Sequence, residues 1–454
     1  MNRRPTIASG EYARRRRALL RAVGDDAIVL VPAASVCYRN GDAAYPYRQN
    51  SDFLYLTGFE EPDALLMLAP GRSAAEQILF CRDRDARAER YDGARLGPER
   101  AAQCLALDDA FPIGDADEIV PGLLEGRKRV YFSLGASPEF DRRVMDWVAE
   151  VCSRIGADGH PQHEFVDIGH LLHDARLVKS AAEQRMMREA ARVSADAHRR
   201  AMERVCDGMN EGVVEAELFL AFREGGARAA AYESIVAGGE RACTMHYVRN
   251  DAPLRDGELV LIDAGCEYGG YAADITRTFP VSGVFGPSQR ELYDLVLAAQ
   301  QAAIDAVRPG ASFNAPHEAA NRVLTQGLVD LGVLEGELEA LVEAEASRPW
   351  TVHKSSHWLG LDVHDVGDYR LGDAWRDLAP GMVLTIEPGL YFHADLESVP
   401  ERFAGIGIRI EDDVLVTEDG CEILTAGVPK DPDEIETLMA EARGQTRLPF
   451  GAYA

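Results

Sequence analysis

A single hairpin constrains the fold of this chain more than any other segment. Residues 259–262 (LVLI) form an apolar run that ends in Asp263, a Gly269-Gly270 turn follows, and Asp274 lies in the returning segment. A tight turn centred between Tyr268 and Gly269 places Asp263 directly opposite Asp274, with Cβ atoms about 4.5–5.5 Å apart. Two carboxylates this close repel each other unless a proton or a cation lies between them.

The hairpin therefore indicates a metal site, because a pair of divalent ions about 3.5–4 Å apart would neutralise the two charges. The alternative is an ordinary solvated hairpin with two surface acids. The segment alone leaves both open, so the other ionisable residues of the chain have to be considered.

Three histidines gather in a second segment, residues 353–364, out of 11 in the whole chain. His353 and His357 have the spacing of a helical zinc pair, but Lys354 stands where the HExxH motif needs glutamate, which excludes that motif. Together with His364 they still indicate imidazoles gathered for metal ligation or proton transfer.

Two further apolar strands each end in a glutamate. Glu387 follows residues 384–386 (LTI) and Glu411 follows residues 408–410 (IRI), positions where a buried carboxylate without a partner would be costly. Arg409 shares the strand face of Glu411 and could hold a carboxylate in place; an ordinary surface pair is the alternative. We expect Asp412 and Asp413 to form a solvated strand end.

These segments supply four carboxylates and one imidazole, a set that suits manganese, cobalt, iron or zinc better than a thiol-preferring metal. Two divalent cations would offset the four carboxylates and leave a near-neutral site. Metal coordination lowers the pKa of water towards neutrality and supplies a nucleophile at physiological pH. Hydrolysis is the reaction class that this set predicts.

Composition argues against several other classes of protein. With 48 basic and 75 acidic residues the net charge is −27, which disfavours a nucleic-acid-binding surface. We find no apolar run of about 18 residues, and the stretch after Arg14 to Arg17 is too short for a signal peptide. The 8 cysteines form no C-x-x-C pair, so we expect reduced thiols in a cytoplasmic protein.

The sequence predicts two domains. Apolar runs at residues 27–31, 65–68, 77–81 and 129–132, with a helical stretch at 139–155, predict an α/β domain over about the first 175 residues. Ser180 and Glu183 form a capping-box pattern that opens a long helix to about residue 206. Helices at 213–223, 288–307 and 315–331, with strands at 258–265, 271–281, 382–388, 407–417 and 422–424, are typical of an α+β domain.

With these segments the chain closely resembles aminopeptidase P, the Xaa-Pro aminopeptidase family of the pita-bread metallopeptidases. The resemblance spans about residues 11–441 and includes YPYRQNSDF at residues 45–53, which is similar to aminopeptidase P in particular. It implies a creatinase-like N-terminal domain at residues 1–176 and a pita-bread catalytic domain at residues 177–454. The implied activity is hydrolysis of the bond between an N-terminal residue and a following proline.

Residue by residue, the resemblance implies two metal ions bridged by Asp274 and Glu411. The implied metal ligands are Asp263, Asp274, His357, Glu387 and Glu411. The catalytic and substrate-contacting residues that we predict are His246, His353, His364, Glu387 and Arg409. The resemblance also implies manganese, with zinc or cobalt as alternatives, and a homo-oligomer, either a tetramer or a dimer. The expected partner is a peptide with proline second, and neither a nucleic acid nor a membrane.

Three other functions remain open at this point. Prolidase shares the five ligands but accepts only dipeptides, and a pita-bread domain can also serve as a non-catalytic binding module. A two-metal phosphoesterase would need more cations near the metals than Arg409 and Lys354. Lys354 stands where related sequences commonly have a glycine, which bears on the substrate preference but not on ligation.

Overall fold

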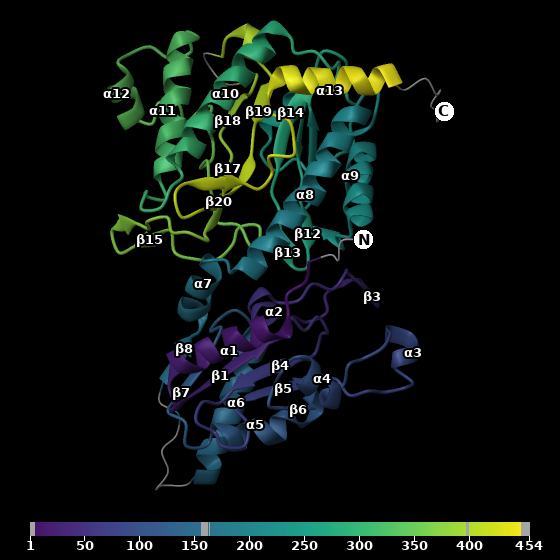
Figure 1. The fold of residues 1–454 in the computed structure, drawn as a ribbon, viewed down its shortest axis with the longest axis vertical. Coiled ribbons are helices and arrows are strands. Elements are labelled where there is room, and N and C mark those ends of the chain that lie inside the picture. The colour runs from purple at the N-terminus through teal and green to yellow at the C-terminus, as the bar shows by residue number, and fades with distance from the viewer. Residues whose placement is uncertain (1–4, 156–161, 163, 396–398, 446–454) are drawn as a thin grey trace. The chain divides into compact units, whose positions relative to one another are not determined.

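The computed structural model describes residues 5–155, 162, 164–395 and 399–445. Within them the chain forms two compact units, and the division falls between Arg176 and Leu177. Helices and sheets occur in both units (Figure 1), so the chain is an α+β protein. Each unit is described by itself below.

The unit that begins at Thr6 is built on one mixed sheet. Its strands are β1 (Ala27–Pro32), β4 (Leu65–Leu68), β5 (Gln77–Cys81), β6 (Asp109–Pro112), β7 (Arg129–Phe132) and β8 (Glu164–Asp167). The strand order is β6-β5-β4-β1-β7-β8, with β1 antiparallel to β4 and parallel to β7. All four predicted apolar runs are strands of this sheet, and a small separate hairpin joins β2 (Tyr38–Asn40) to β3 (Ala43–Ala44).

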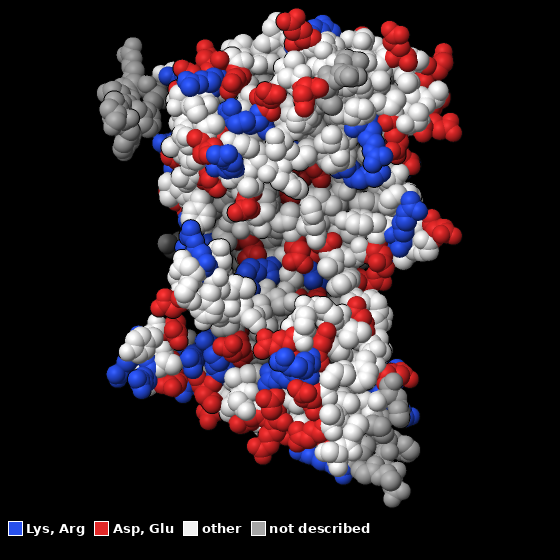
Figure 2. Space-filling view, turned by 180° about the vertical axis from the view of Figure 1, so that it is seen from behind, with Lys and Arg blue, Asp and Glu red and all other residues white. Residues whose placement is uncertain are grey.

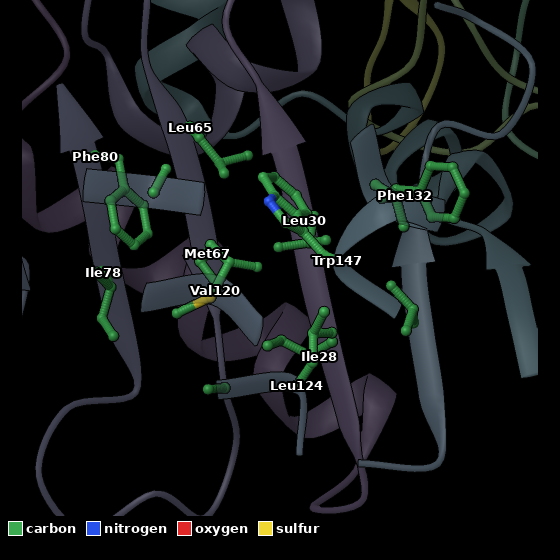
Figure 3. Packing of buried hydrophobic residues seen from close by; sticks show 14 of the residues in the cluster. Ile28, Leu30, Leu65, Met67, Ile78, Phe80, Val120, Leu124, Phe132 and Trp147 are labelled. Atoms are coloured by element: carbon green, nitrogen blue, oxygen red, sulfur yellow. The ribbon is translucent and has the colours of Figure 1, made fainter. Parts of the chain in front are cut away.

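Helices accompany this sheet. They are α1 (Ser9–Val23), α2 (Ser51–Thr57), α3 (Glu89–Asp92), α4 (Pro98–Cys104), α5 (Ala116–Leu124), α6 (Pro138–Ile155) and α7 (Gly169–Leu177), with a 3-10 turn η1 (Ile113–Asp115). Alternate strand residues such as Ile28, Leu30, Leu65 and Met67 share one face, as the two-residue period requires. Figure 3 shows that this face packs against α5 and α6, which contribute Trp147 among others.

The second unit opens with the predicted long helix. Ser180 accepts a hydrogen bond from the Glu183 N–H and Glu183 accepts one from the Ser180 N–H, which confirms the capping box. The helices of this unit are α8 (Ala181–Arg204), α9 (Glu211–Gly225), α10 (Pro287–Ala306), α11 (Ala315–Asp330), α12 (Leu338–Glu343) and α13 (Pro432–Gln445), with 3-10 turns η3 (Gly239–Cys243) and η4 (Glu401–Phe403).

Short sheets in the second unit bring distant strands together. The strands are β9 (Ala229–Ala230), β10 (Ile235–Gly238), β11 (Leu259–Asp263), β12 (Cys266–Tyr268), β13 (Tyr271–Ala272), β14 (Thr276–Pro280), β15 (Arg370–Leu371), β16 (Ala374–Trp375), β17 (Val383–Ile386), β18 (Gly389–Phe392), β19 (Ile406–Arg409), β20 (Asp412–Val416) and β21 (Cys421–Ile423). Their sheets are β10-β11-β14, β13-β12-β9, β17-β20-β21, β18-β19 and β15-β16.

Two strands that the sequence predicts as continuous are interrupted. The predicted strand at 271–281 divides into β13 and β14, and Asp274 lies in the gap; the predicted strand at 407–417 divides into β19 and β20, and Glu411 lies in that gap. At both carboxylates the backbone therefore leaves the regular ladder, which apolar periodicity alone does not reveal.

The hairpin register also differs from the predicted one. Asp263 pairs with Thr276, and Tyr268 pairs with Tyr271. The turn is centred between Gly269 and Gly270, whose φ values of 57° and 88° suit a two-residue hairpin turn that only glycine adopts at little cost. The prediction that Asp274 lies directly opposite Asp263 was wrong, because it centred the turn one residue too early.

The two carboxylates still share one face of the hairpin. Asp274 is two residues from Thr276, the partner of Asp263, and the Tyr232 hydroxyl contacts both carboxylates, so they lie on the same side. The strands approach closely where they bend: a Cβ added at Gly265 would lie 1.7 Å from the Ala273 carbonyl oxygen. Glycine is therefore required at that position.

The face of the molecule in Figure 2 carries acidic and basic side chains interspersed with each other. Among the described residues, no helix is both long enough and apolar enough to cross a membrane.

Candidate metal centre

Asp263 and Asp274 converge on one phenol. The Tyr232 hydroxyl oxygen lies 2.6 Å from Asp263 Oδ1 and 2.5 Å from Asp274 Oδ1. A phenol has only one hydrogen to donate, so both contacts are satisfied only when a proton or a cation accompanies the carboxylates. Burial and the nearby charge of Asp274 raise the pKa of Asp263, because repulsion between the two carboxylates favours the protonated form.

His357 faces this pair with a defined ring orientation. Its Nδ1 lies 3.0 Å from the Trp358 carbonyl oxygen, which only an N–H can satisfy, so Nε2 is left to face the carboxylates. Nε2 lies 3.5 Å from Asp274 Oδ2 and 3.5 Å from Glu387 Oε1. Burial opposes the charged form of His357, but Asp274 and Glu387 raise its pKa to about 9.

The two strand-end glutamates complete the cluster. The Glu387 N–H donates to the Ser355 carbonyl, which ties the end of β17 to the histidine segment. Glu411 is held against β14: its N–H donates to the Thr276 carbonyl at 3.0 Å and its Oε2 accepts from Thr276 Oγ1 at 2.7 Å. Burial is the main cause that raises the pKa of Glu387 to about 7 and the pKa of Glu411 well above its usual range.

Arg409 holds a carboxylate, as the sequence suggested. Arg409 is 2% exposed, and its guanidinium donates to Asp263 Oδ2 at 2.6 Å, to the Tyr391 hydroxyl at 2.8 Å and to Thr276 Oγ1 at 3.0 Å. The alternative of a solvated surface pair is therefore wrong. The carboxylate that Arg409 contacts is Asp263, while Glu411 receives its hydrogen bond from Thr276.

The predicted catalytic histidines have different surroundings. His353 Nε2 lies 2.9 Å from the Tyr391 hydroxyl and its Nδ1 lies 3.4 Å from Glu387 Oε2, and burial lowers the pKa of His353 to about 3. The His364 ring lies 4.2 Å from that of His357, centroid to centroid. Burial, with nearby His357 and His246, lowers the pKa of His364. His246 itself is exposed.

Asp412 and Asp413 contradict the sequence prediction of a solvated strand end. They are 0% and 1% exposed. Burial opposes ionisation of Asp412, but Arg277 and Lys430 lower its pKa to about 2, whereas burial and Asp274 raise the pKa of Asp413. The error has a physical cause: β20 is covered by residues from distant segments, and adjacent acids in a sequence do not show whether cations lie over them.

The donor set fits divalent cations. Among the described residues, Asp274, His357 and Glu411 each offer one ligand atom, and these atoms lie within 4.8 Å of one another. Asp263 flanks this group through the shared Tyr232 contact, and Glu387 flanks it through His357. Oxygen donors with one imidazole suit hard and borderline metals, and the positive charge would relieve the carboxylate repulsion.

Sequence reasoning missed three residues of this centre. Tyr232 lies in an irregular segment before β10 and Tyr391 lies among apolar residues of β18, so no local pattern distinguishes either from a packing residue. Thr276 could have been found, because it lies two residues after Asp274 and alternate residues share a strand face.

Known proteins that resemble the chain cover nearly its whole length. The family model of metallopeptidase family M24 matches residues 185–418, and that of the aminopeptidase P N-terminal domain matches residues 12–131. The Xaa-Pro aminopeptidase of Escherichia coli (strain K12) is 44% identical, over 97% of this chain and 99% of that protein.

Two solved structures share the fold. That of Pseudomonas aeruginosa aminopeptidase PepP has a TM-score of 0.95 at 54% identity, covering 97% of this chain and 99% of that chain. A zinc-substituted E. coli aminopeptidase P in complex with product has a TM-score of 0.93 at 44% identity, covering 96% and 99%. The chain therefore belongs to metallopeptidase family M24, and its full-length relatives place it in the aminopeptidase P group of that family.

The metal-free protein is expected to lose stability as the pH rises from 5 to 9. Glu387 has a folded pKa of about 7, above the value of about 4.3 for an unfolded glutamate, so its deprotonation favours unfolding. His357 acts in the same direction: its proton is held more tightly in the folded state, up to a pKa of about 9.

Urea unfolding of metal-stripped protein at pH 5, 7 and 9 measures this effect. Glu387→Gln removes one titrating group and should flatten the decline by roughly 2–3 kcal/mol. Glu422→Gln is the control, since Glu422 forms a half-exposed pair with Arg188 away from the cluster. If the free energy of unfolding declined equally from pH 5 to pH 9 in wild type and in Glu387→Gln, the raised pKa assigned to Glu387 would be wrong.

Proposed function

We propose that this protein is a dinuclear metallo-aminopeptidase that releases the first residue of a peptide whose second residue is proline. The observation that carries the proposal is the convergence of Asp263, Asp274, His357, Glu387 and Glu411, from four separate segments, in a chain of the aminopeptidase P group. The E. coli relative, which is similar to this chain over 99% of its own length, is named for this activity.

The five converging residues are the proposed ligands, with Asp274 and Glu411 bridging two ions. The central position of these two supports the bridging role, because both belong to the tight group with His357. We propose manganese as the resident metal, with cobalt or zinc as alternatives. Zinc is included because a relative, the E. coli aminopeptidase P, has a zinc-substituted structure.

Glu387 is the proposed proton carrier. When bound, the metal ions supply a water of lowered pKa as nucleophile. Glu387, buried beside His357, would accept a proton from that water and return it to the proline nitrogen, which must be protonated before it can leave. His353 and His364 hold the scissile carbonyl, and His246 contacts the substrate.

Arg409 and Tyr391 support this arrangement. Arg409 fixes Asp263 and the Tyr391 hydroxyl, and the Tyr391 hydroxyl in turn contacts His353 Nε2. The lowered pKa of His353 keeps its imidazole neutral, so that Nδ1 donates to the Lys354 carbonyl at 2.8 Å and Nε2 accepts from the Tyr391 hydroxyl.

The remaining parts of the proposal concern organisation. We propose residues 1–176 as the N-terminal aminopeptidase P-like domain and residues 177–454 as the catalytic domain. We propose a cytoplasmic homo-oligomer, tetramer or dimer, that acts on free peptides. These proposals rest on the similarity to aminopeptidase P and on the scattered free cysteines.

Mass spectrometry of a peptide that begins Arg-Pro-Pro tests the activity. The manganese-loaded protein should release free arginine and leave a product one residue shorter that begins with proline. The dipeptide Ala-Pro and a phosphomonoester are assayed in parallel. Turnover of the dipeptide alone would indicate a prolidase, turnover of the phosphomonoester would indicate a phosphoesterase, and no turnover would indicate a binding module.

Glu387→Gln is expected to lower turnover by about 10²–10⁴-fold, because an amide cannot carry the proton. The variant should keep its fold by circular dichroism, and its rate is compared with that of wild type at equal measured metal content. Glu422→Gln, a substitution of the same kind at the surface, should keep the wild-type rate. If Glu387→Gln retained a tenth of wild-type turnover, the proton-carrier role would be wrong.

Metal should stabilise the folded protein, because cations relieve the repulsion within the cluster. At a free concentration of 100 times Kd the gain is about 2.7 kcal/mol, visible by calorimetry as a rise in Tm on addition of manganese. Asp274→Asn should lose most of this rise, whereas Asp256→Asn, an exposed acid of the segment before β11, should keep it. The same rise in Asp274→Asn as in wild type would mean that the metal site is elsewhere.

A further inference from the structure

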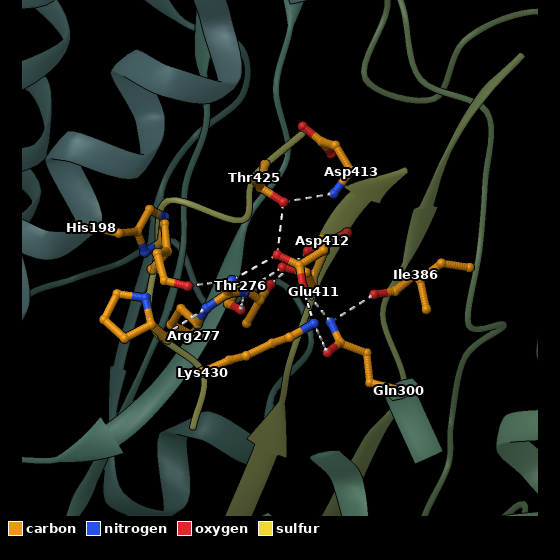
Figure 4. Close-up of polar contacts among 12 residues, drawn as sticks. His198, Thr276, Arg277, Gln300, Ile386, Glu411, Asp412, Asp413, Thr425 and Lys430 are labelled. Atoms are coloured by element: carbon orange, nitrogen blue, oxygen red, sulfur yellow. Dashed lines mark hydrogen bonds and ion pairs between the residues drawn. The ribbon is translucent and has the colours of Figure 1, made fainter. Parts of the chain in front are cut away.

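A buried polar cluster lies behind the proposed metal ligands, centred on Arg277 of β14 (Figure 4). The guanidinium is fully buried, and each of its five N–H groups has an acceptor. The acceptors are the carbonyl oxygens of Thr276 (3.0 Å), Glu411 (2.5 Å), Val428 (3.2 Å) and Pro429 (3.1 Å) and Asp412 Oδ1 (2.7 Å). Burying a charge this completely costs desolvation free energy, which the hydrogen bonds and a counter-charge have to offset.

Asp412 is the counter-charge, and its carboxylate is fully occupied. Oδ1 accepts from Arg277 and from Thr425 Oγ1 at 2.7 Å, while Oδ2 accepts from Lys430 Nζ at 2.7 Å and from Gln300 Nε2 at 3.0 Å. Figure 4 shows these side chains converging on Asp412 from separate elements. Each of these four side chains therefore has a hydrogen-bond partner on the Asp412 carboxylate.

Arg277 fixes Glu411 relative to β14. One nitrogen, Nη1, donates both to the Thr276 carbonyl and to the Glu411 carbonyl, and the Glu411 N–H donates to that same Thr276 carbonyl. Thr276 Oγ1 also donates to the Glu411 carboxylate. Glu411 is thus held at its amide, its carbonyl and its side chain.

The same cluster reaches Asp274. The Asp274 N–H donates to the Asp413 carboxylate at 3.1–3.2 Å, and the Asp413 N–H donates to Thr425 Oγ1, which donates to Asp412. Asp274 and Glu411 both lie where their strands are interrupted, outside the ladder that elsewhere fixes the backbone. Something other than sheet hydrogen bonding must set the distance between them.

We propose that Arg277, locked by Asp412, is a positioning residue that sets the spacing of Asp274 and Glu411 and thereby the affinity of the site for divalent ions. This inference rests on the proposed metal site. Residues behind metal ligands act in this way by holding each ligand in the orientation that binding requires. The ligands then lose less conformational entropy when the metal binds.

The test measures metal binding directly. Manganese is titrated by calorimetry into the metal-stripped full-length protein, and the Tm of the metal-free form is recorded for each variant. Arg277→Lys keeps the charge but loses the planar fork, so it cannot bridge both carbonyls and Asp412 together. We expect its manganese affinity to fall at least tenfold, with a changed electron paramagnetic resonance spectrum of the loaded centre.

Lys430→Met is the matched control. Lys430 contacts Asp412 Oδ2 and Gln300 but neither of the carbonyls that Arg277 bridges. Its loss should lower the Tm of the metal-free protein and leave manganese affinity within about twofold of wild type. Equal affinity losses in Lys430→Met and Arg277→Lys would overturn the inference, because they would show a general effect of stability.

If Arg277→Lys does not fold, Asp412→Asn is used to test the positioning role of Arg277 instead. It removes the counter-charge of Arg277 while keeping an acceptor oxygen, and we expect an affinity loss at least threefold greater than in Lys430→Met. Manganese affinity within twofold of wild type in whichever of the two variants folds overturns the inference but not the proposed function. A wild-type protein that bound no manganese, zinc or cobalt would overturn both.

Discussion

Mutual repulsion among four buried carboxylates is the constraint on which the rest of the catalytic unit depends. Asp263 and Asp274 come from one hairpin, Glu387 and Glu411 come from two other segments, and burial penalises each negative charge. The protein offsets this in part with two cations, Arg409 on Asp263 and a protonated His357 beside Asp274 and Glu387, whereas the charge of Arg277 is balanced by Asp412. These do not neutralise four charges, so the site retains an affinity for cations that no ordinary surface pair would have.

The backbone follows from the same constraint. A regular antiparallel ladder would hold alternate side chains at fixed spacings of about 4.5–5.5 Å across strands, which is too rigid a pattern for carboxylates that must surround a common centre. The strands are interrupted at Asp274 and at Glu411, where side chains satisfy backbone groups: Asp413 accepts from the Asp274 N–H, and Arg277 donates to the Glu411 carbonyl. Gly265, which has no room for a Cβ, allows the hairpin to bend there.

Opposite surroundings give two histidines of one segment different chemistry. Carboxylates on one side of His357 raise its pKa to about 9, whereas burial beside Arg409 lowers that of His353 to about 3. Four residues apart in the chain, one imidazole is suited to a site that attracts positive charge and the other to neutral hydrogen bonding. Nothing in the local sequence distinguishes the two histidines, so the difference between their pKa values arises only in the folded protein.

The sequence by itself determined many of the helices and strands and the ionisable residues of the site. Apolar runs located β1, β4, β5 and β7 of the N-terminal sheet, and the Ser180–Glu183 spacing located the capping box of α8, because both are signals within a few residues. Strand-end acids pointed to Asp263, Asp274, Glu387 and Glu411 for the same reason. Tertiary structure alone decided the hairpin register, the burial of Asp412 and Asp413, and the presence of Tyr232 and Tyr391. Those features depend on contacts such as that of Thr276 with Glu411, 135 residues apart, and no local pattern records which distant side chain covers a strand.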